Sequence, residues 1–436
     1  MFKNKLLLFK VLILFMQVLF CSLPAFSKPM DINSYFGFYT KEASFQFSSK
    51  LFVPSIKKPD QNTAKKYVRN TLKYTLGQMH EEGSIYGDFQ IQINEIQSKA
   101  IEGFEVQYTI SGKGVFSFSS NDFTFYIPYS LNSIYKKSSE TCHEASEDIR
   151  EDNFWYNWKP NKFGCLLVED VDYYKVKSNL KLVSSNQITY PEYSRLITDN
   201  KIAGTIFFSP ESHDNTDWNP YAGKDYGSKD YVTTSRYLIG LGYQLKTLSL
   251  AEIKSLAEID STIRVPTVEE YSKKVGEKQI IYRLIYSETA LYNRHSKNFH
   301  ALLSRSLKND SLIIYQGHSG IGRNLNLKLI ENQSKTKIQF GSQYQIMFFG
   351  SCMPYAYYTD MYFKAKSSPQ DLTGRKNLDI LGYGKESHFG NIDNQRLIKA
   401  IDQYLVLEKK SSYQDIVTSS PVDFFGVIGD EDNVDN

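Results

Sequence analysis

From about residue 200 onward the chain alternates short apolar runs with amphipathic segments, and this alternation constrains the fold more than any other feature. The apolar runs lie at 203–208, 243–250, 279–286, 311–316, 344–349 and 378–383. Segments of helical periodicity follow most of them, at 228–241, 250–259, 294–308, 354–365 and 391–408. Such alternation is typical of βαβ units around a buried parallel sheet. We therefore expect an α/β domain over 197–410, with a mostly parallel sheet and helices on both faces.

The region before residue 197 has a different pattern. Its runs alternate apolar and polar residues, which indicates antiparallel strands with one solvated face, and they lie at 89–96, 104–110, 122–129 and 173–183. One helix is predicted over 62–79 from its apolar stripe. We expect a smaller α+β domain over 28–196, and a C-terminal extension over 411–436 that ends in an acidic tail.

The first 27 residues have the layout of a cleavable secretory signal. Lysines come first, an apolar run extends over 6–20, and the small-residue pattern Ala25-Phe26-Ser27 follows. We therefore expect an exported protein, periplasmic or extracellular, and no later segment is apolar and long enough to predict a membrane span.

The charge balance changes when the signal is set aside. Three of the 51 Lys and Arg residues lie in 1–27 and no acid does, which leaves 48 basic against 48 acidic residues. A net charge near zero gives no electrostatic reason to expect a nucleic-acid partner.

Signal cleavage would also remove Cys21 and leave three cysteines, Cys142, Cys165 and Cys352. In an oxidising compartment two of them are expected to pair. Cys142 and Cys165 flank a polar loop, so we expect the bridge there, with a stabilisation of about 3 kcal/mol in the chain-entropy model. Cys352 would then remain a thiol.

Two apolar runs end in a glycine followed by a reactive side chain. SLIIYQGHSG (311–320) presents His318, and YQIMFFGSCM (344–353) presents Cys352. Ligands of open parallel sheets bind beyond the carboxyl ends of the strands, and consecutive strands are usually neighbours about 5 Å apart. A thiol needs an adjacent base to act as a nucleophile near neutral pH, so the pair is a candidate catalytic dyad.

The surrounding residues add candidates of weaker signal. Glycines 317, 320 and 350 permit tight turns that expose N–H groups. Arg323 follows the strand of His318 and is a candidate substrate-binding residue. Asp379 is a second one, although it begins its strand instead of ending it. The loop 209–229 is long enough to line a site. The segment 265–275 is also polar, and is as plausibly a mere connection.

These two motifs resemble the caspase-like cysteine peptidases, a group that includes caspases, legumains, clostripain and gingipains. In that family the histidine ends one strand and the cysteine the next, in a sheet with helices on both faces. The resemblance covers roughly 200–410. It implies that Cys352 is the nucleophile, His318 the general base, the N–H groups of Ser319 (or Gly320) and Cys352 the oxyanion hole, and a peptide or protein the substrate. It implies no cofactor.

Two other interpretations stay open at this point. The chain has Ser319 where the family usually has glycine after the histidine, and it lacks the caspase sequence around the cysteine, which also fits an inactive relative. Such a relative would be a cell-envelope binding or interaction protein. His318 and Cys352 could also be structural residues of the sheet. No metal site is expected, because the histidines lack ligand spacing.

Overall fold

The structure is a computed structural model that describes most of the chain. The described residues are 36–37, 40–81, 85–99, 103–117, 119–137, 140–143, 158–182, 188–211, 219–335, 337–384, 393–418, 420 and 425–429. The predicted signal at 1–27 and the acidic tail at 430–436 lie outside these ranges.

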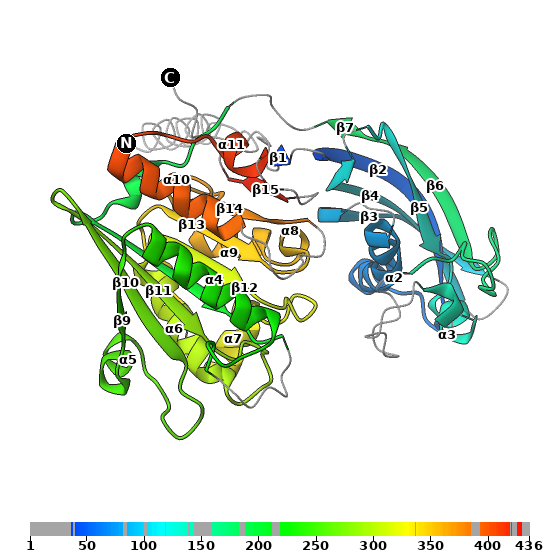
Figure 1. The fold of residues 1–436 in the computed structure, drawn as a ribbon. Helices are drawn as coiled ribbons and strands as arrows, with labels where there is room; N and C mark the ends of the chain where they lie inside the picture. The colour runs from blue at the N-terminus through cyan, green and yellow to red at the C-terminus, as the bar shows by residue number, and fades with distance from the viewer. Residues whose placement is uncertain are drawn as a thin grey trace, which may run out of the picture.

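Five parallel strands form the centre of the C-terminal unit (Figure 1). In spatial order they are β14 (Leu378–Tyr383), β13 (Gln345–Gly350), β12 (Leu312–Gln316), β8 (Lys201–Phe208) and β11 (Lys278–Tyr286). Beyond β11 the sheet continues with two antiparallel strands, β10 (Thr267–Val275) and β9 (Gln244–Thr247). Beyond β14 it continues with antiparallel β15 (Phe425–Ile428). The protein is thus an α/β protein with a large mixed sheet.

Helices cover both faces of the parallel strands because successive side chains of each strand point to opposite faces. In β12, for example, Ile314 joins one buried cluster and Tyr315 the other. The cluster of Ile314 is closed by α4 (Tyr226–Gly240), α10 (Asp393–Leu407) and α11 (Tyr413–Thr418). The cluster of Tyr315 is closed by α5 (Leu250–Leu256), α6 (Ser296–Asn309), α7 (Leu327–Ser334), α8 (Pro354–Tyr357) and α9 (Thr359–Lys366).

Local sequence signals explain where several of these helices begin. Asp225 caps α4 by accepting the Ser228 N–H, and Asn326 caps α7 by accepting the Leu329 N–H. Before α5, Ser249 and Glu252 form a reciprocal capping box. Each cap satisfies backbone donors that the first helical turn leaves unpaired.

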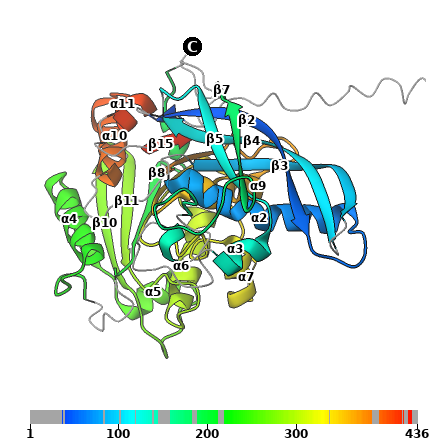
Figure 2. The same ribbon diagram turned by 90° about the vertical axis from the view of Figure 1, so that its right-hand side faces the viewer.

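The N-terminal unit is built on three long antiparallel strands with a helix packed against them (Figure 2). The strands are β2 (Thr40–Val53), β4 (Gly103–Ser117) and β3 (Ile85–Lys99), and the helix is α2 (Gln61–Glu81). A separate pair, β5 (Asp122–Pro128) with β6 (Tyr173–Asn179), contributes to the same core, and α3 (Leu131–Lys137) and β7 (Lys181–Leu182) complete the unit. The short strand β1 (Phe36–Gly37) pairs with both β2 and β15 and so joins the two units into one sheet.

Two expectations about individual segments are wrong. The segment 265–275 is not a connection, because Thr267–Val275 forms β10, with Val268 and Tyr271 buried. The run 243–250 contributes only the four exposed residues of β9, which pairs antiparallel with β10 and is not a buried parallel strand. β9 is the last strand on this side of the sheet and β10 lies between it and β11, where polar residues on the exposed face are tolerated and apolar periodicity is weak.

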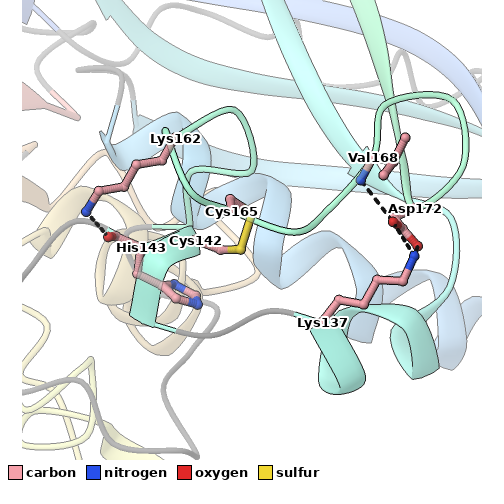
Figure 3. Close-up of a disulfide and its surroundings, with 7 residues drawn as sticks. All are labelled: Lys137, Cys142, His143, Lys162, Cys165, Val168 and Asp172. Atoms are coloured by element: carbon pink, nitrogen blue, oxygen red, sulfur yellow. Dashed lines mark hydrogen bonds and ion pairs between the residues drawn. A yellow bond between two sulfur atoms is a disulfide. The ribbon is translucent and has the colours of Figure 1, made fainter.

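The expected bridge between Cys142 and Cys165 is present in the N-terminal unit, where Figure 3 shows it beside two lysine contacts. Lys162 donates to the His143 carbonyl, and Lys137 pairs with the buried carboxylate of Asp172 at 2.8 Å. The bridge lies next to the buried Trp158, whose ring packs edge-on against Tyr74. The disulfide therefore closes a small aromatic core.

No helix in the described ranges combines the length and the apolarity needed to cross a bilayer.

Candidate functional site

His318 and Cys352 follow the carboxyl ends of two neighbouring parallel strands, at the same height along the sheet. The register pairs Gln316 of β12 with Gly350 of β13, and each reactive residue comes two positions later. The Gly317 N–H also donates to the Gly350 carbonyl, at 3.2 Å, so the pairing continues one residue past β12. Both side chains are half-buried, and Cys352 is outside the disulfide. The structure thus brings the two predicted residues to the same edge of the sheet.

The imidazole of His318 is oriented by a backbone group on the other side of β12. Its Nε2 lies 3.0 Å from the carbonyl oxygen of Glu211, three residues after the end of β8. A carbonyl oxygen can only accept, so Nε2 carries the proton in the neutral ring and Nδ1 carries the lone pair. Glu211 lies in the loop 209–229 that was expected to line a site, but it could not be singled out, since a backbone acceptor leaves no mark on residue type.

The backbone of His318 is fixed by two side-chain donors. The Tyr315 hydroxyl donates to the His318 carbonyl at 2.7 Å, and Asn324 Nδ2 donates to the same oxygen at 2.9 Å. Tyr315 also lies 2.9 Å from the Thr289 hydroxyl, while Asn324 Oδ1 accepts the Leu291 N–H at 3.1 Å. Burial raises the pKa of Tyr315, which keeps it a hydroxyl and therefore a donor.

Two positions at this edge require glycine, because neighbouring atoms leave no room for a Cβ. A Cβ on Gly350 would lie 1.7 Å from Gln316 Oε1, so the Gln316 amide occupies the space above β13 that a side chain would need. A Cβ on Gly317 would lie 2.6 Å from the Cβ of Ser209. Contacts this short do not occur, so these positions exclude any larger residue without rearrangement.

The predicted oxyanion residues lie in the turn after His318. Their carbonyls accept hydrogen bonds, that of Ser319 from the Tyr358 hydroxyl at 2.9 Å and that of Gly320 from the Arg323 N–H at 3.2 Å. Their N–H groups donate to no other residue in the described part of the chain. Gly320 has φ +56°, and Met353, directly after Cys352, has φ +53°, so both reactive residues precede a left-handed turn position.

Two buried polar groups beside His318 and Cys352 were not singled out from the sequence. Gln316 Nε2 and Ser351 Oγ have no hydrogen-bond partner among the described residues, although Gln316 is 7% exposed and Ser351 is fully buried. Buried donors of this kind are rare in folded proteins and costly unless something occupies them. Gln316 lies two residues before His318, and Ser351 lies directly before Cys352.

The two predicted substrate-binding residues are in different places. Arg323 is exposed in the turn that follows His318, on the same edge of the sheet. Asp379 is fully buried at the opposite, amino end of β14, where its Oδ2 accepts from the hydroxyls of Tyr344 and Tyr413. The structure therefore brings Arg323, but not Asp379, to the edge that carries His318 and Cys352.

The described residues contain no group of three or more His, Cys, Asp or Glu side chains that could hold a metal ion.

No protein-family model matches the chain, and neither a curated protein nor a solved structure matches it.

Proposed function

We propose that this protein is an exported thiol-dependent peptidase with a caspase-like arrangement of Cys352 and His318. The observation that carries the proposal is that His318 and Cys352 each follow, by two residues, a pair of directly opposite residues on neighbouring parallel strands. The Glu211 carbonyl orients the histidine ring. A nucleophile, a base and a third group that orients the base form the usual constellation for covalent hydrolysis of peptide bonds. The half-buried Cys352 side chain suits a nucleophile that a peptide must reach.

The chemistry follows from this arrangement. His318 Nδ1 takes the thiol proton, and the Cys352 sulfur attacks the peptide carbonyl carbon. The resulting oxyanion accepts hydrogen bonds from the N–H groups of Cys352 and of Ser319 or Gly320. Collapse of this intermediate breaks the C–N bond, and the leaving amine takes the proton from the imidazolium. His318 then deprotonates a water molecule, which hydrolyses the thioester and releases the thiol.

Export is the part of the proposal that rests on the N-terminal sequence and the cysteines. The Cys142–Cys165 disulfide is typical of proteins that reside in an oxidising compartment. A periplasmic or extracellular peptidase would be consistent with both features.

A second candidate function is binding of a partner without turnover, and one observation favours it. A cleft of about 1080 Å³ lies between the polar face of β2 and the helices α8 and α9. Its lining includes Ser44, Gln46 and Ser48 from β2, opposite Tyr355 and Thr359. A cleft of this size between the two units would suit a polypeptide partner.

A thiol-directed peptide probe separates the two functions. The mature protein is incubated with a fluorescent peptidyl chloromethyl ketone library, and the modified residue is identified by peptide mass mapping. A peptidase would be labelled at Cys352 in the folded state. His318→Ala would lose labelling while His295→Ala, a histidine from another loop, would keep it. Labelling that occurs only after denaturation would leave the binding function.

A further inference from the structure

Three consecutive residues in the turn after His318 have a left-handed backbone. Gly320, Ile321 and Gly322 have φ values of +56°, +54° and +75°. Glycine adopts such values freely, but a β-branched residue such as Ile321 does so at a cost. A strained residue of this kind persists only where neighbouring groups hold it. The turn therefore depends on contacts from outside itself.

These contacts come from the helical segment that follows Cys352. The hydroxyl of Tyr358, a fully buried residue at the junction of α8 and α9, donates to the Ser319 carbonyl at 2.9 Å. Its neighbour Tyr357 lies so close to Gly322 that a Cβ there would be 2.9 Å from the ring. Burial raises the pKa of Tyr358 well above its usual value, so the hydroxyl keeps the proton that it donates. The segment after the thiol thus holds the turn that carries the predicted oxyanion donors.

The direction of a carbonyl fixes the direction of the N–H group in the same peptide. In a trans peptide the two groups point to opposite sides, and the described part of the chain contains no cis peptide bond. The Ser319 carbonyl points to the buried Tyr358 hydroxyl and also accepts the Asn324 N–H at 3.1 Å. The N–H of Gly320, which is exposed, therefore points away from this buried side. It donates to no residue in the described ranges.

We infer that Tyr358 is a positioning residue that orients the Gly320 N–H toward the oxyanion formed on a bound peptide, an assignment that rests on the proposed peptidase function. An oxyanion hole is effective because its donors are fixed before the charge develops. Since Tyr358 belongs to the segment that follows Cys352, its hydrogen bond fixes the donor relative to the nucleophile. Without the hydroxyl, the strained turn would be free to relax and the N–H would lose its orientation.

A peptidyl aldehyde library tests the oxyanion donor without knowledge of the substrate sequence. The Cys352 sulfur bonds to the aldehyde carbon, the π electron pair moves to the aldehyde oxygen, and the thiol proton passes to His318. The adduct therefore carries an oxyanion like that of the peptide intermediate. Its affinity is given by the aldehyde concentration that halves labelling of Cys352 by the chloromethyl ketone library of the same sequences.

Tyr358→Phe should raise this concentration at least about tenfold, because the adduct loses an oriented donor. The pH profile of Cys352 alkylation by iodoacetamide should stay unchanged, since formation of the thiolate does not use the oxyanion donor. Tyr362→Phe is the matched control. The Tyr362 hydroxyl is also buried, one turn further along α9, and donates to the Leu325 carbonyl at 3.1 Å. Both variants should lose similar thermal stability, but Tyr362→Phe should bind the aldehydes as the unsubstituted protein does.

Three results would overturn the assignment and leave the peptidase proposal standing. The first is an aldehyde affinity that Tyr358→Phe does not change. The second is an equal loss of affinity in Tyr358→Phe and Tyr362→Phe, which would mean a general effect on the fold. The third is labelling of Cys352 by the chloromethyl ketones that no aldehyde prevents in the unsubstituted protein. If the chloromethyl ketones do not label Cys352 in the folded protein, the peptidase proposal itself fails, and the assignment fails with it.

Discussion

Among single residues, His318 is held by contacts to both its ring and its backbone. Its ring contacts the Glu211 carbonyl, and its own carbonyl accepts from Tyr315 and Asn324. Tyr315 and Asn324 belong to the same strand and turn as His318, whereas Glu211 follows β8, so the ring is oriented by the pairing of β8 with β12 and not by the local turn alone. The sequence could point to His318 and Cys352, because each follows an apolar run and a glycine. It could not point to Glu211, because its contribution is a backbone oxygen.

Tyr315→Phe tests whether the hydrogen bonds that hold the His318 backbone stabilise the protein. The change removes the hydroxyl that donates to the His318 carbonyl and contacts Thr289, while the ring stays. We expect the free energy of unfolding to fall by about 1–2 kcal/mol, because buried polar partners lose a hydrogen bond. Urea denaturation measures the effect. Tyr292→Phe, at a tyrosine that is 72% exposed, is the matched control and should have no effect. Equal unfolding free energies of the two variants would argue against a stabilising role for the Tyr315 hydrogen bonds.

At the scale of elements, the contact between β12 and β13 sets the geometry of the site. Gln316 lies over Gly350, and this is where the two strands bring His318 and Cys352 to one level. The burial of these strands could be predicted, because both consist almost entirely of apolar residues, and they were expected to be neighbours because they follow each other along the chain. The two strands beyond β11 could not be predicted in this way. β10 contains TVEEYSKKV, and its buried Glu269 is accommodated only because the hydroxyls of Tyr221 and Tyr271 donate to it.

Gly350→Ala tests the strand contact. The new methyl group would overlap Gln316 Oε1, so we expect a loss of about 1–3 kcal/mol in unfolding free energy from overpacking. Gly240→Ala is the control, since nothing lies within 4 Å of a Cβ at the end of α4. It should be neutral or slightly stabilising. Thermal denaturation of both variants gives the comparison, and a Gly350→Ala protein as stable as Gly240→Ala would contradict the packing described.

His300 in α6 predicts a pH dependence of stability. Burial lowers its pKa from 6.5 to about 4, so the folded state binds fewer protons than the unfolded state between these values. Unfolding free energy should therefore fall as the pH falls from about 6.5 to about 4, by roughly 3 kcal/mol from this residue. His300→Phe should remove that part of the loss. Urea denaturation at each pH gives the unfolding free energies of the two proteins. Their difference separates the contribution of His300 from that of the other titratable groups. Parallel curves would mean that His300 is not desolvated.

In the whole molecule the two units share one sheet, and their cores meet at Val115 of β4, which packs into the cluster that contains Tyr315. The N-terminal core surrounds α2, and the C-terminal cores lie on the two faces of the parallel strands. Besides the pairings of β1, a side-chain contact joins the two units. Tyr355, three residues after Cys352, donates its hydroxyl to the buried carboxylate of Glu42 at 2.7 Å. The change in pattern near residue 200 could be read from the sequence. The continuity of the sheet through β1 could not, because a strand of two residues carries no periodicity.

Removal of the disulfide tests how far the two units depend on each other. Cys142→Ala with Cys165→Ala should lower the free energy of unfolding by about 3 kcal/mol, because the reduced chain gains entropy when unfolded. The alkylation rate of Cys352 in the folded protein should not change, since the bridge belongs to the N-terminal core. Calorimetry and thiol labelling measure the two effects. A strong change in Cys352 reactivity would show that the candidate site depends on the N-terminal core.

The pH profile of Cys352 alkylation is the most direct test of whether His318 activates Cys352. Iodoacetamide is applied to the folded protein between pH 5 and 9, and modified Cys352 is quantified by mass spectrometry. An ordinary thiol reacts with a midpoint near 8.5, whereas a thiolate paired with imidazolium reacts well below it. We expect Cys352 to react at least about tenfold faster at pH 6.5 than in the His318→Ala protein. His295→Ala should match the unsubstituted protein. If Cys352 instead reacts only on unfolding, or identically with and without His318, the dyad does not exist.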